Sequence, residues 1–231
     1  RAVFGLYPAQ RTGADTVSVF DETAQQVTHT FEHLRQQSDK VTGKPNLSLA
    51  DFISTSKDNT DYLGGFTVSI FGAEELANEY KAKGDDYSAI LIQSLADRFA
   101  EAFAEHLHER IRKEFWGYKA DETLGNEELI KEKYVGIRPA PGYPAWPEHS
   151  EKAVLFDWLG SEAKIGTKLT EHFAMMPPSS VSGFYYSHPQ SEYFNVGKVS
   201  QDQLEDYAKR KGWTLDEAKR WLAPNLDDSI V

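Results

Sequence analysis

The residues best suited to chemistry lie between Arg138 and Pro147, in the sequence Arg-Pro-Ala-Pro-Gly-Tyr-Pro-Ala-Trp-Pro. Arg138 carries a planar guanidinium whose donors match the geometry of a carboxylate or a phosphate. The four prolines fix their own φ angles and disfavour helix at the residue before each of them. Only Gly142 can take a left-handed φ without strain. We therefore predict a stiff, extended segment with one tight bend, and we call it the proline ribbon.

The residues of the proline ribbon leave two interpretations open. A backbone that is ordered before binding loses little conformational entropy when it holds a ligand, so the ribbon is suited to a small zwitterionic or nucleoside-like molecule. Many conspicuous loops, however, only connect two elements of secondary structure. The composition of the segment does not favour either interpretation over the other.

Other polar residues lack the spacing of a recognised reactive site. His29 and His33 are four residues apart but have no carboxylate at a zinc-binding spacing. The sequence Glu-His-Leu-His-Glu at 105–109 is not in the order of a zinc protease. Ser187 and His188 are chain neighbours, whereas the members of a catalytic triad usually converge from separate segments. We therefore predict neither a catalytic residue nor a metal site.

The composition limits the class of partner. The chain has 231 residues, of which 25 are basic and 36 acidic, for a formal net charge of −11. That charge repels a phosphate backbone, so we do not expect binding to nucleic acid. The absence of cysteine excludes disulfides and thiolate sites and suits a reducing compartment. No apolar run approaches the ~20 residues of a membrane span, and the N-terminus does not resemble a signal peptide. We expect a cytoplasmic protein that does not bind membranes.

The elements that must position the ribbon are strands near both ends of the chain with helices between them. Alternation and β-branched residues predict strands at 2–8, 16–20, 62–72, 170–175, 181–187 and 191–196. Apolar spacing and capping residues predict helices at 73–83, 87–117, 126–134, 148–159, 200–212 and 214–224. This order predicts a single α+β domain with a mostly antiparallel sheet.

The longest predicted helix, 87–117, has an unusual apolar stripe. Its large apolar residues recur every four positions, so the stripe turns round the helix by roughly 40° at each step. We expect other elements to cover this helix along much of its length. Glu101 lies almost opposite the stripe, and from the residues alone we expect it to be solvated. The stripe consists of Leu91, Leu95, Phe99, Phe103, Leu107, Ile111 and Phe115.

The two predicted C-terminal helices have clear start signals. Ser200 with Gln203, and Thr214 with Glu217, both match the capping box. A helix pair of this kind resembles a DNA-binding helix-turn-helix, but the acidic charge argues against that interpretation.

The proline ribbon and the residues after it, Glu-His-Ser-Glu-Lys at 148–152, resemble the signature of the activation domain of cobalamin-dependent methionine synthase. The resemblance extends from Arg1 to the C-terminus. Further segments that carry it include Asp-Asp-Tyr at 85–87, Leu-Ala-Asp-Arg at 95–98, Val-Ser-Gly at 181–183 and Trp-Leu-Ala-Pro at 221–224.

The resemblance implies a C-shaped domain with a twisted antiparallel sheet and flanking helices, which binds S-adenosylmethionine in a shallow groove. The parent enzyme methylates homocysteine from methyltetrahydrofolate through cobalamin, which is held by a neighbouring cobalamin-binding domain. When the cobalamin is oxidised, this domain would support its reductive methylation by S-adenosylmethionine. Flavodoxin or a flavoprotein reductase would supply the electron. An orienting role agrees with the lack of a catalytic constellation, because the two cofactors carry the reaction.

The resemblance also implies which residues meet the ligand. Arg138 would hold the carboxylate of the methionyl part. Tyr193 and Phe194 would line the groove. Glu101 and Glu132 match acidic residues near the family site, with roles left open. Backbone groups of three ribbon residues would meet the adenosine part: Ala140, Gly142 and Tyr143.

Two departures and two alternatives accompany the resemblance. The chain begins at Arg1 without a Met, so we expect residues 1–231 to be an activation domain that lacks the family's N-terminal helical region, which contributes an Asp to the ligand site. Trp146 is bulkier than the family pattern, which predicts altered outer packing of the ribbon. The alternatives are a non-catalytic docking module for a flavoprotein and a stand-alone reactivation domain of another corrinoid enzyme.

Overall fold

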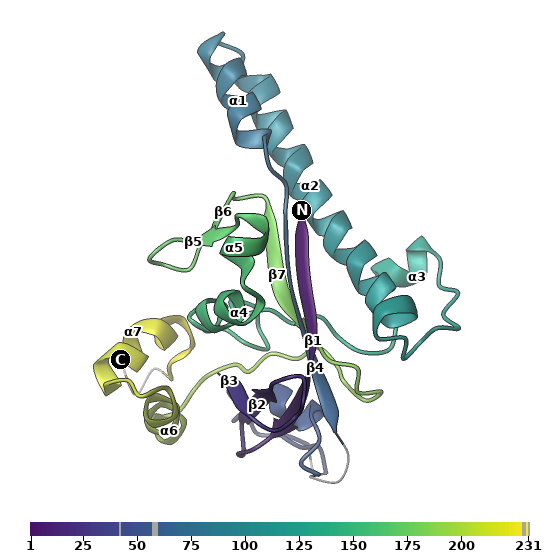
Figure 1. The fold of residues 1–231 in the computed structure, drawn as a ribbon. Coiled ribbons are helices and arrows are strands. Elements are labelled where there is room, and N and C mark those ends of the chain that lie inside the picture. The colour runs from purple at the N-terminus through teal and green to yellow at the C-terminus, as the bar shows by residue number, and fades with distance from the viewer. Residues whose placement is uncertain (42, 57–59, 228–229, 231) are drawn as a thin grey trace. The chain divides into compact units, whose positions relative to one another are not determined.

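The structure, a computed structural model, describes residues 1–41, 43–56, 60–227 and 230 (Figure 1). Its strands are β1 (Ala2–Arg11), β2 (Thr16–Phe20), β3 (Val27–Glu32), β4 (Asp61–Ser69), β5 (Lys168–Leu169), β6 (Met175–Met176) and β7 (Ser180–Tyr185). Its α-helices are α1 (Ala73–Ala82), α2 (Asp86–Arg110), α3 (Asn126–Ile130), α4 (Glu151–Leu159), α5 (Ser161–Ile165), α6 (Gln201–Lys211) and α7 (Leu215–Leu222). Short turns are η1 (Leu49–Phe52), the π-helical η2 (Ile111–Phe115) and η3 (Ala223–Asn225).

The main sheet has the strand order β3-β2-β1-β4-β7, and β5 and β6 form a separate small pair. The β1–β2 and β2–β3 pairs are antiparallel, with Ala9 opposite Val19 and Thr16 opposite Glu32. β-Branched residues favour these strands because their side chains pack well on a half-buried pleated surface. The predicted α+β class with a mostly antiparallel sheet is confirmed.

Two of the predicted strands are wrong. At 170–175 the chain makes a turn, in which the amide of Phe173 donates to the carbonyl of Thr170 at 2.9 Å and Phe173 has a φ of 61°. The described residues 191–196 form no strand. There the carbonyl of Asn195 accepts a hydrogen bond from the side chain of Gln36 at 2.8 Å. Hydrogen bonds to side chains thus occupy backbone groups that would otherwise pair with a neighbouring strand.

The chain divides into two compact units. The first contains residues 1–5, 65–134 and 155–183, and the second contains residues 6–64, 135–154 and 184–231. Strands β1, β4 and β7 each contribute residues to both units. Each unit has its own buried side chains.

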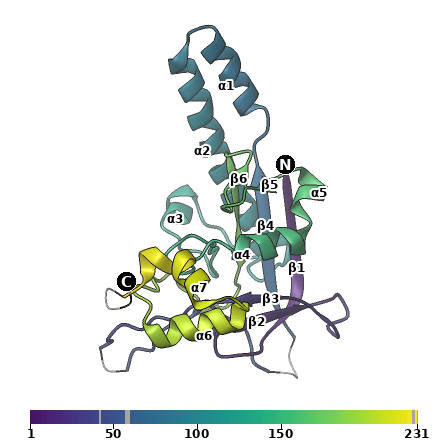
Figure 2. The same ribbon diagram turned by 90° about the vertical axis from the view of Figure 1, so that its left-hand side faces the viewer.

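In the first unit, α1 packs alongside α2 (Figures 1 and 2). The buried face of α2 consists mainly of small residues, including Ala89, Ala96, Ala100 and Ala104. Several large residues of the predicted stripe are exposed instead, and Phe99 is 61% exposed. The prediction that other elements cover this stripe is therefore wrong over much of the helix, because the alanine face provides the close packing.

A buried ion pair stabilises the end of α2 in the same unit. The guanidinium of Arg112 donates to both carboxylate oxygens of Glu122, at 2.8 and 2.6 Å. Arg112 is fully buried, and its guanidinium lies 4.3 Å from the ring centre of Tyr134. This bidentate geometry satisfies two charges that would be costly to bury alone.

In the second unit, the C-terminal helices pack on a hydrophobic cluster. Tyr207 of α6 and Leu222 of α7 are buried there with Leu34, Val196 and Val199. The two helices lie next to each other (Figure 2).

Of the two predicted capping boxes, only the contact at Thr214 forms. The hydroxyl of Thr214 accepts a hydrogen bond from the amide of Glu217 at 3.2 Å. Ser200 makes no side-chain capping bond, because its hydroxyl donates to the carboxylate of Asp202 instead. The prediction of a capping box at Ser200 is therefore wrong.

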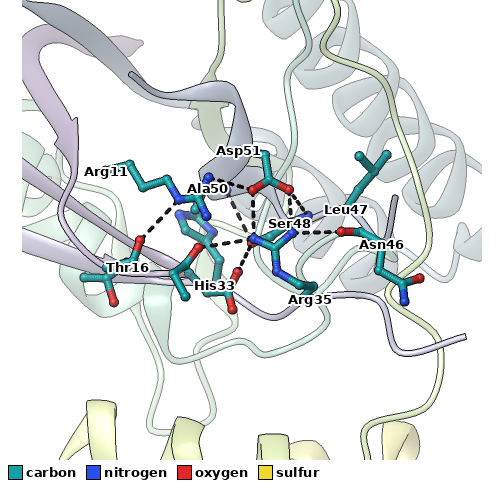
Figure 3. Close-up of polar contacts among 12 residues, drawn as sticks. Arg11, Thr16, His33, Arg35, Asn46, Leu47, Ser48, Ala50 and Asp51 are labelled. Atoms are coloured by element: carbon teal, nitrogen blue, oxygen red, sulfur yellow. Dashed lines mark hydrogen bonds and ion pairs between the residues drawn. The ribbon is translucent and has the colours of Figure 1, made fainter. Parts of the chain in front are cut away.

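A polar cluster links the end of β1, the residue before β2 and the segment after β3 to η1 in this unit (Figure 3). Arg35 donates to both carboxylate oxygens of Asp51 at 2.7 Å and also pairs with Asp15 at 2.7 Å. Arg11 reaches the same Asp51 at 2.8 Å, and the amide of Ser48 donates to it at 2.9 Å. Because the charges largely neutralise one another, we interpret this cluster as structural.

Candidate functional site: the proline ribbon

The proline ribbon lies in the second unit and contains a tightly hydrogen-bonded bend. The amide of Gly142 donates to the carbonyl of Trp146 at 2.7 Å, and the amide of Trp146 donates to the carbonyl of Tyr143 at 2.8 Å. The amide of Tyr143 donates to the carbonyl of Ala140 at 3.2 Å. Gly142 has a φ of 96°, which side chains disfavour. The predicted stiff segment with its bend at Gly142 is confirmed.

The start of the ribbon pairs with the end of β7 and the residue after it. Ile137 and Tyr186 exchange backbone hydrogen bonds of 3.0 and 3.1 Å, and the amide of Phe184 donates to the carbonyl of Pro139 at 2.9 Å. The ribbon is therefore held along one edge by main-chain hydrogen bonds, and its prolines do not interrupt this pairing because Pro139 takes part through its carbonyl.

Trp146 holds the end of the bend in the core of the unit. Its side chain is fully buried, and its indole N–H donates to the carbonyl of Glu32 at 3.1 Å. Its ring centre lies 4.1 Å from that of His33 and 4.8 Å from that of Phe184. We expected Trp146 to change the outer packing of the ribbon, but the structure places it on the inner side, in the core.

Arg138 and Tyr193 meet in the second unit. The backbone amide of Arg138 donates to the hydroxyl of Tyr193 at 2.9 Å, and Tyr193 is 40% exposed. Phe194, its neighbour, is half-buried and packs against the hydrophobic cluster of α6 and α7. Tyr143 at the bend is 57% exposed. The ribbon thus carries an arginine and the exposed Tyr143, and the exposed Tyr193 is hydrogen-bonded to its backbone.

Glu101 and Glu132 belong to the first unit. Glu101 lies on α2 with its side chain exposed, as expected from the residues alone. Glu132 lies in the turn after α3, also exposed, with a φ of 53°. Their predicted association with the ligand remains a prediction.

A buried polar network lies where the ribbon leads into α4. The carboxylate of Glu148 accepts hydrogen bonds from the amide and hydroxyl of Ser150 and from the hydroxyl of Tyr207, the last at 3.2 Å. Glu151 pairs with Lys211 of α6 at 2.5 Å. From the sequence, residues 148–151 are a predicted helix start and part of the family signature, with no role assigned to their acidic side chains. The structure shows that both Glu148 and Glu151 are buried.

Burial governs the protonation of this region. Burial raises the pKa of Glu151 to about 7, although the Lys211 ammonium opposes the shift. Burial raises the pKa of Tyr207 well above its usual value, and Glu148 adds to this. Burial, with help from Arg210, lowers the pKa of His33 to about 3, so the imidazole beside Trp146 is neutral at physiological pH.

The described residues offer neither a cluster of metal ligands nor a membrane-spanning helix. Over residues 1–41, 43–56, 60–227 and 230, no group of three or more His, Cys, Asp and Glu side chains is placed to hold a metal ion. Within the same ranges, the helices are too short or too polar to cross a membrane.

Comparisons with known proteins agree with the resemblance noted above. The family model described as "Vitamin B12 dependent methionine synthase, activation domain" matches residues 1–212. A solved structure titled "Crystal Structure of the MetH Reactivation Domain bound to AdoHcy" is 53% identical in sequence, with a TM-score of 0.94. That match covers 98% of this chain and 70% of the solved one. This chain therefore belongs to the family of activation domains of vitamin-B12-dependent methionine synthase.

Proposed function

We propose that this domain binds S-adenosylmethionine on the proline ribbon and presents it as the methyl donor for reactivation of the parent methionine synthase. The observation that carries the proposal is the likeness to a reactivation domain bound to AdoHcy at 53% identity. AdoHcy is what remains of S-adenosylmethionine after its methyl group has left. A site that holds one is therefore suited to hold the other.

The geometry of the second unit supports separate roles for the residues of the proposed site. Arg138 carries the donors that suit the ligand's carboxylate. The bend at Gly142 and Tyr143 offers backbone and an aromatic ring to the adenosine part, and Tyr193 lies beside Arg138. Because this backbone is already ordered by internal hydrogen bonds, binding requires little further ordering. We include Ala140, Phe194, Glu101 and Glu132 in the proposal on the family pattern.

The chain's part in the reaction is to bind and to orient. Cobalamin, held by another domain of the parent enzyme, supplies the cobalt that accepts the methyl group. A methyl transfer between two cofactors depends on alignment of the reacting atoms more than on acid–base groups. The proline ribbon meets that need because its backbone has few accessible conformations.

Calorimetry with S-adenosylmethionine tests the proposal. We expect Arg138→Ala to weaken binding by about 2 kcal/mol, roughly 30-fold, since it removes charge-assisted hydrogen bonds. Arg220→Ala, which removes an exposed arginine of α7, is the matched control and should bind like the wild type. Equal affinities for Arg138→Ala and the wild type would overturn the assignment of the ribbon.

The parent reaction and its electron donor are further parts of the proposal. We infer that residues 1–231 act within a cytoplasmic 5-methyltetrahydrofolate–homocysteine methyltransferase, and that flavodoxin or a flavoprotein reductase delivers the electron. The family membership supports this context. Reconstitution of the full-length enzyme with oxidised cobalamin, S-adenosylmethionine and either flavoprotein tests it, because activity should return only when a flavoprotein is present.

A further inference from the structure

The ring of His149 lies directly against the bend of the proline ribbon. A Cβ atom added to Gly142 would lie 2.2 Å from Cε1 of His149 and 2.7 Å from its Nδ1. These separations are far below normal contact, so the imidazole fills the space that any side chain at position 142 would occupy. Gly142 is therefore required for two reasons, its φ of 96° and the ring beside it.

Lys152 fixes the orientation of that ring. Its Nζ lies 2.9 Å from Nδ1 of His149. An ammonium can only donate, so Nδ1 is the acceptor and the proton of the neutral ring sits on Nε2. The amide of Lys152 also donates to the carbonyl of His149 at 3.1 Å, in the turn that begins α4. The ring is thus held by Lys152, a residue of the helix that it precedes, α4.

The residue before His149 is fixed as well. Glu148 is fully buried, and its carboxylate is hydrogen-bonded to Ser150 and to Tyr207 of α6. The backbone that carries the imidazole therefore cannot shift without breaking buried hydrogen bonds, which is costly. The bend, the ring and the start of α4 therefore hold one another in place.

Charge decides which form of the ring fits. A protonated imidazole would place a second positive group 2.9 Å from the Lys152 ammonium. Burial, followed by Lys152, lowers the pKa of His149, while Glu148 opposes the shift. The charged groups that face His149 are therefore Lys152 and Glu148. Burial likewise lowers the pKa of Lys152.

We propose that His149 is a positioning residue for nucleoside recognition: its neutral imidazole, oriented by Lys152, sets the backbone of the bend at Gly142 and Tyr143. This inference rests on the proposed function of the ribbon. Its consequence is a pH dependence. Because the pKa of the ring is lowered from its ordinary value, the neutral form predominates at neutral pH, and protonation in acid disfavours the braced bend. Ligand affinity should therefore fall as the pH decreases into the acidic range.

The test combines three variants with calorimetry between pH 5.5 and 8. His149→Ala should weaken S-adenosylmethionine binding about tenfold at pH 7.5 and reduce its pH dependence. His149→Gln, whose amide oxygen can still accept from Lys152, should bind more tightly than His149→Ala and show the same weak pH dependence. Lys152→Gln should weaken binding at pH 7.5, though less than His149→Ala does, because the ring loses the ammonium that orients it. It should also move the loss of affinity to higher pH, because it removes the cation that disfavours protonation. His172→Gln, on an exposed histidine of the first unit, is the control.

A second readout separates this inference from the proposed function. The amide of Gly142 is hydrogen-bonded to the carbonyl of Trp146, so its hydrogen exchange reports the bend without any ligand. Exchange should be faster in His149→Ala than in the wild type. If the wild type binds no S-adenosylmethionine but this acceleration is seen, the proposed function fails while the bracing role holds. Unchanged exchange at Gly142 together with wild-type affinity in His149→Ala would overturn the inference.

Discussion

The proline ribbon and helix α2 both expose large aromatic side chains, but the backbone beneath them is held by different forces. Tyr143 of the ribbon is 57% exposed and Phe99 of α2 is 61% exposed. The helix depends on regular local hydrogen bonds and a face of alanines. The ribbon depends on contacts distant in sequence, such as the bond from Trp146 to Glu32. Exposure alone therefore does not distinguish the two regions, whereas the long-range contacts of the ribbon do.

The largest contrast is expected between Trp146, which is buried, and Phe99, which is exposed. Trp146→Ala should lower the free energy of unfolding by about 4 kcal/mol, because it leaves a cavity beneath the ribbon and removes the hydrogen bond to the carbonyl of Glu32. Phe99→Ala should change it by no more than about 0.5 kcal/mol, since that ring is mostly in solvent. Urea denaturation measures both. Similar losses in the two variants would remove the contrast between the regions.

A pair of glycines gives the next largest difference. Gly142→Ala combines a left-handed φ with a clash against His149, and we expect a loss of about 3 kcal/mol. Gly84→Ala, in the turn between α1 and α2, also has a positive φ but nothing within 4 Å of the added Cβ. It should cost about 1 kcal/mol. Thermal unfolding compares them, and equal costs would mean that His149 does not fill the bend.

The Glu151–Lys211 pair predicts a pH effect on stability. Because the pKa of Glu151 is raised to about 7 by burial, the folded protein binds more protons than the unfolded chain between about pH 4.5 and 7. This group's contribution to stability is therefore present at low pH and lost as the pH rises through 7. We expect Glu151→Gln to remove that decline, about 2–3 kcal/mol between pH 5 and 8. Denaturation at both pH values measures it.

His33 provides the control of opposite sign. Its pKa is lowered to about 3, so its contribution to stability is lost as the pH falls below 6.5. The slope from His33 should persist in Glu151→Gln. If the stability of the wild type declines between pH 5 and 8 no more than that of Glu151→Gln, the assignment to Glu151 is contradicted.

The smallest effect is expected at an exposed ion pair of the first unit. Glu114→Gln breaks the pair with Arg110, whose atoms lie 2.8 Å apart but are largely exposed. We expect little change in the free energy of unfolding, and any change should disappear in high salt. Arg112→Met is the contrasting variant, since it leaves the buried Glu122 unpaired and should cost about 3 kcal/mol. Denaturation at two salt concentrations separates the two pairs.

Local chemistry was sufficient to predict several parts of the molecule. The prolines and Gly142 specify the ribbon and its bend, and Thr214 specifies the start of α7, because the signals act within a few residues. Strand β4 and the helix pair α1 and α2 follow from apolar spacing and from turn residues.

Other parts depend on partners distant in the chain and could not be predicted in that way. The apolar stripe of α2 suggested complete coverage, but spacing cannot show that Ala96 and Ala100 form the close-packed face. The aromatic run at 191–196 suits a strand, yet its backbone meets the side chain of Gln36. For the proposed site, the residue types indicated Arg138 and the family resemblance added Tyr193, while the contact of His149 with the bend emerged only from its distance to Gly142.

The most direct test of the ribbon as the ligand site is an amide-resolved NMR titration of the protein with S-adenosylmethionine. Gly142 and Tyr143 mark the ribbon, and Leu95 and Phe99 mark the exposed face of α2. We predict that the amides of Gly142 and Tyr143 shift most and lose this response in Arg138→Ala. Saturable shifts that gather at Leu95 and Phe99, with the ribbon amides unchanged, would contradict the assignment.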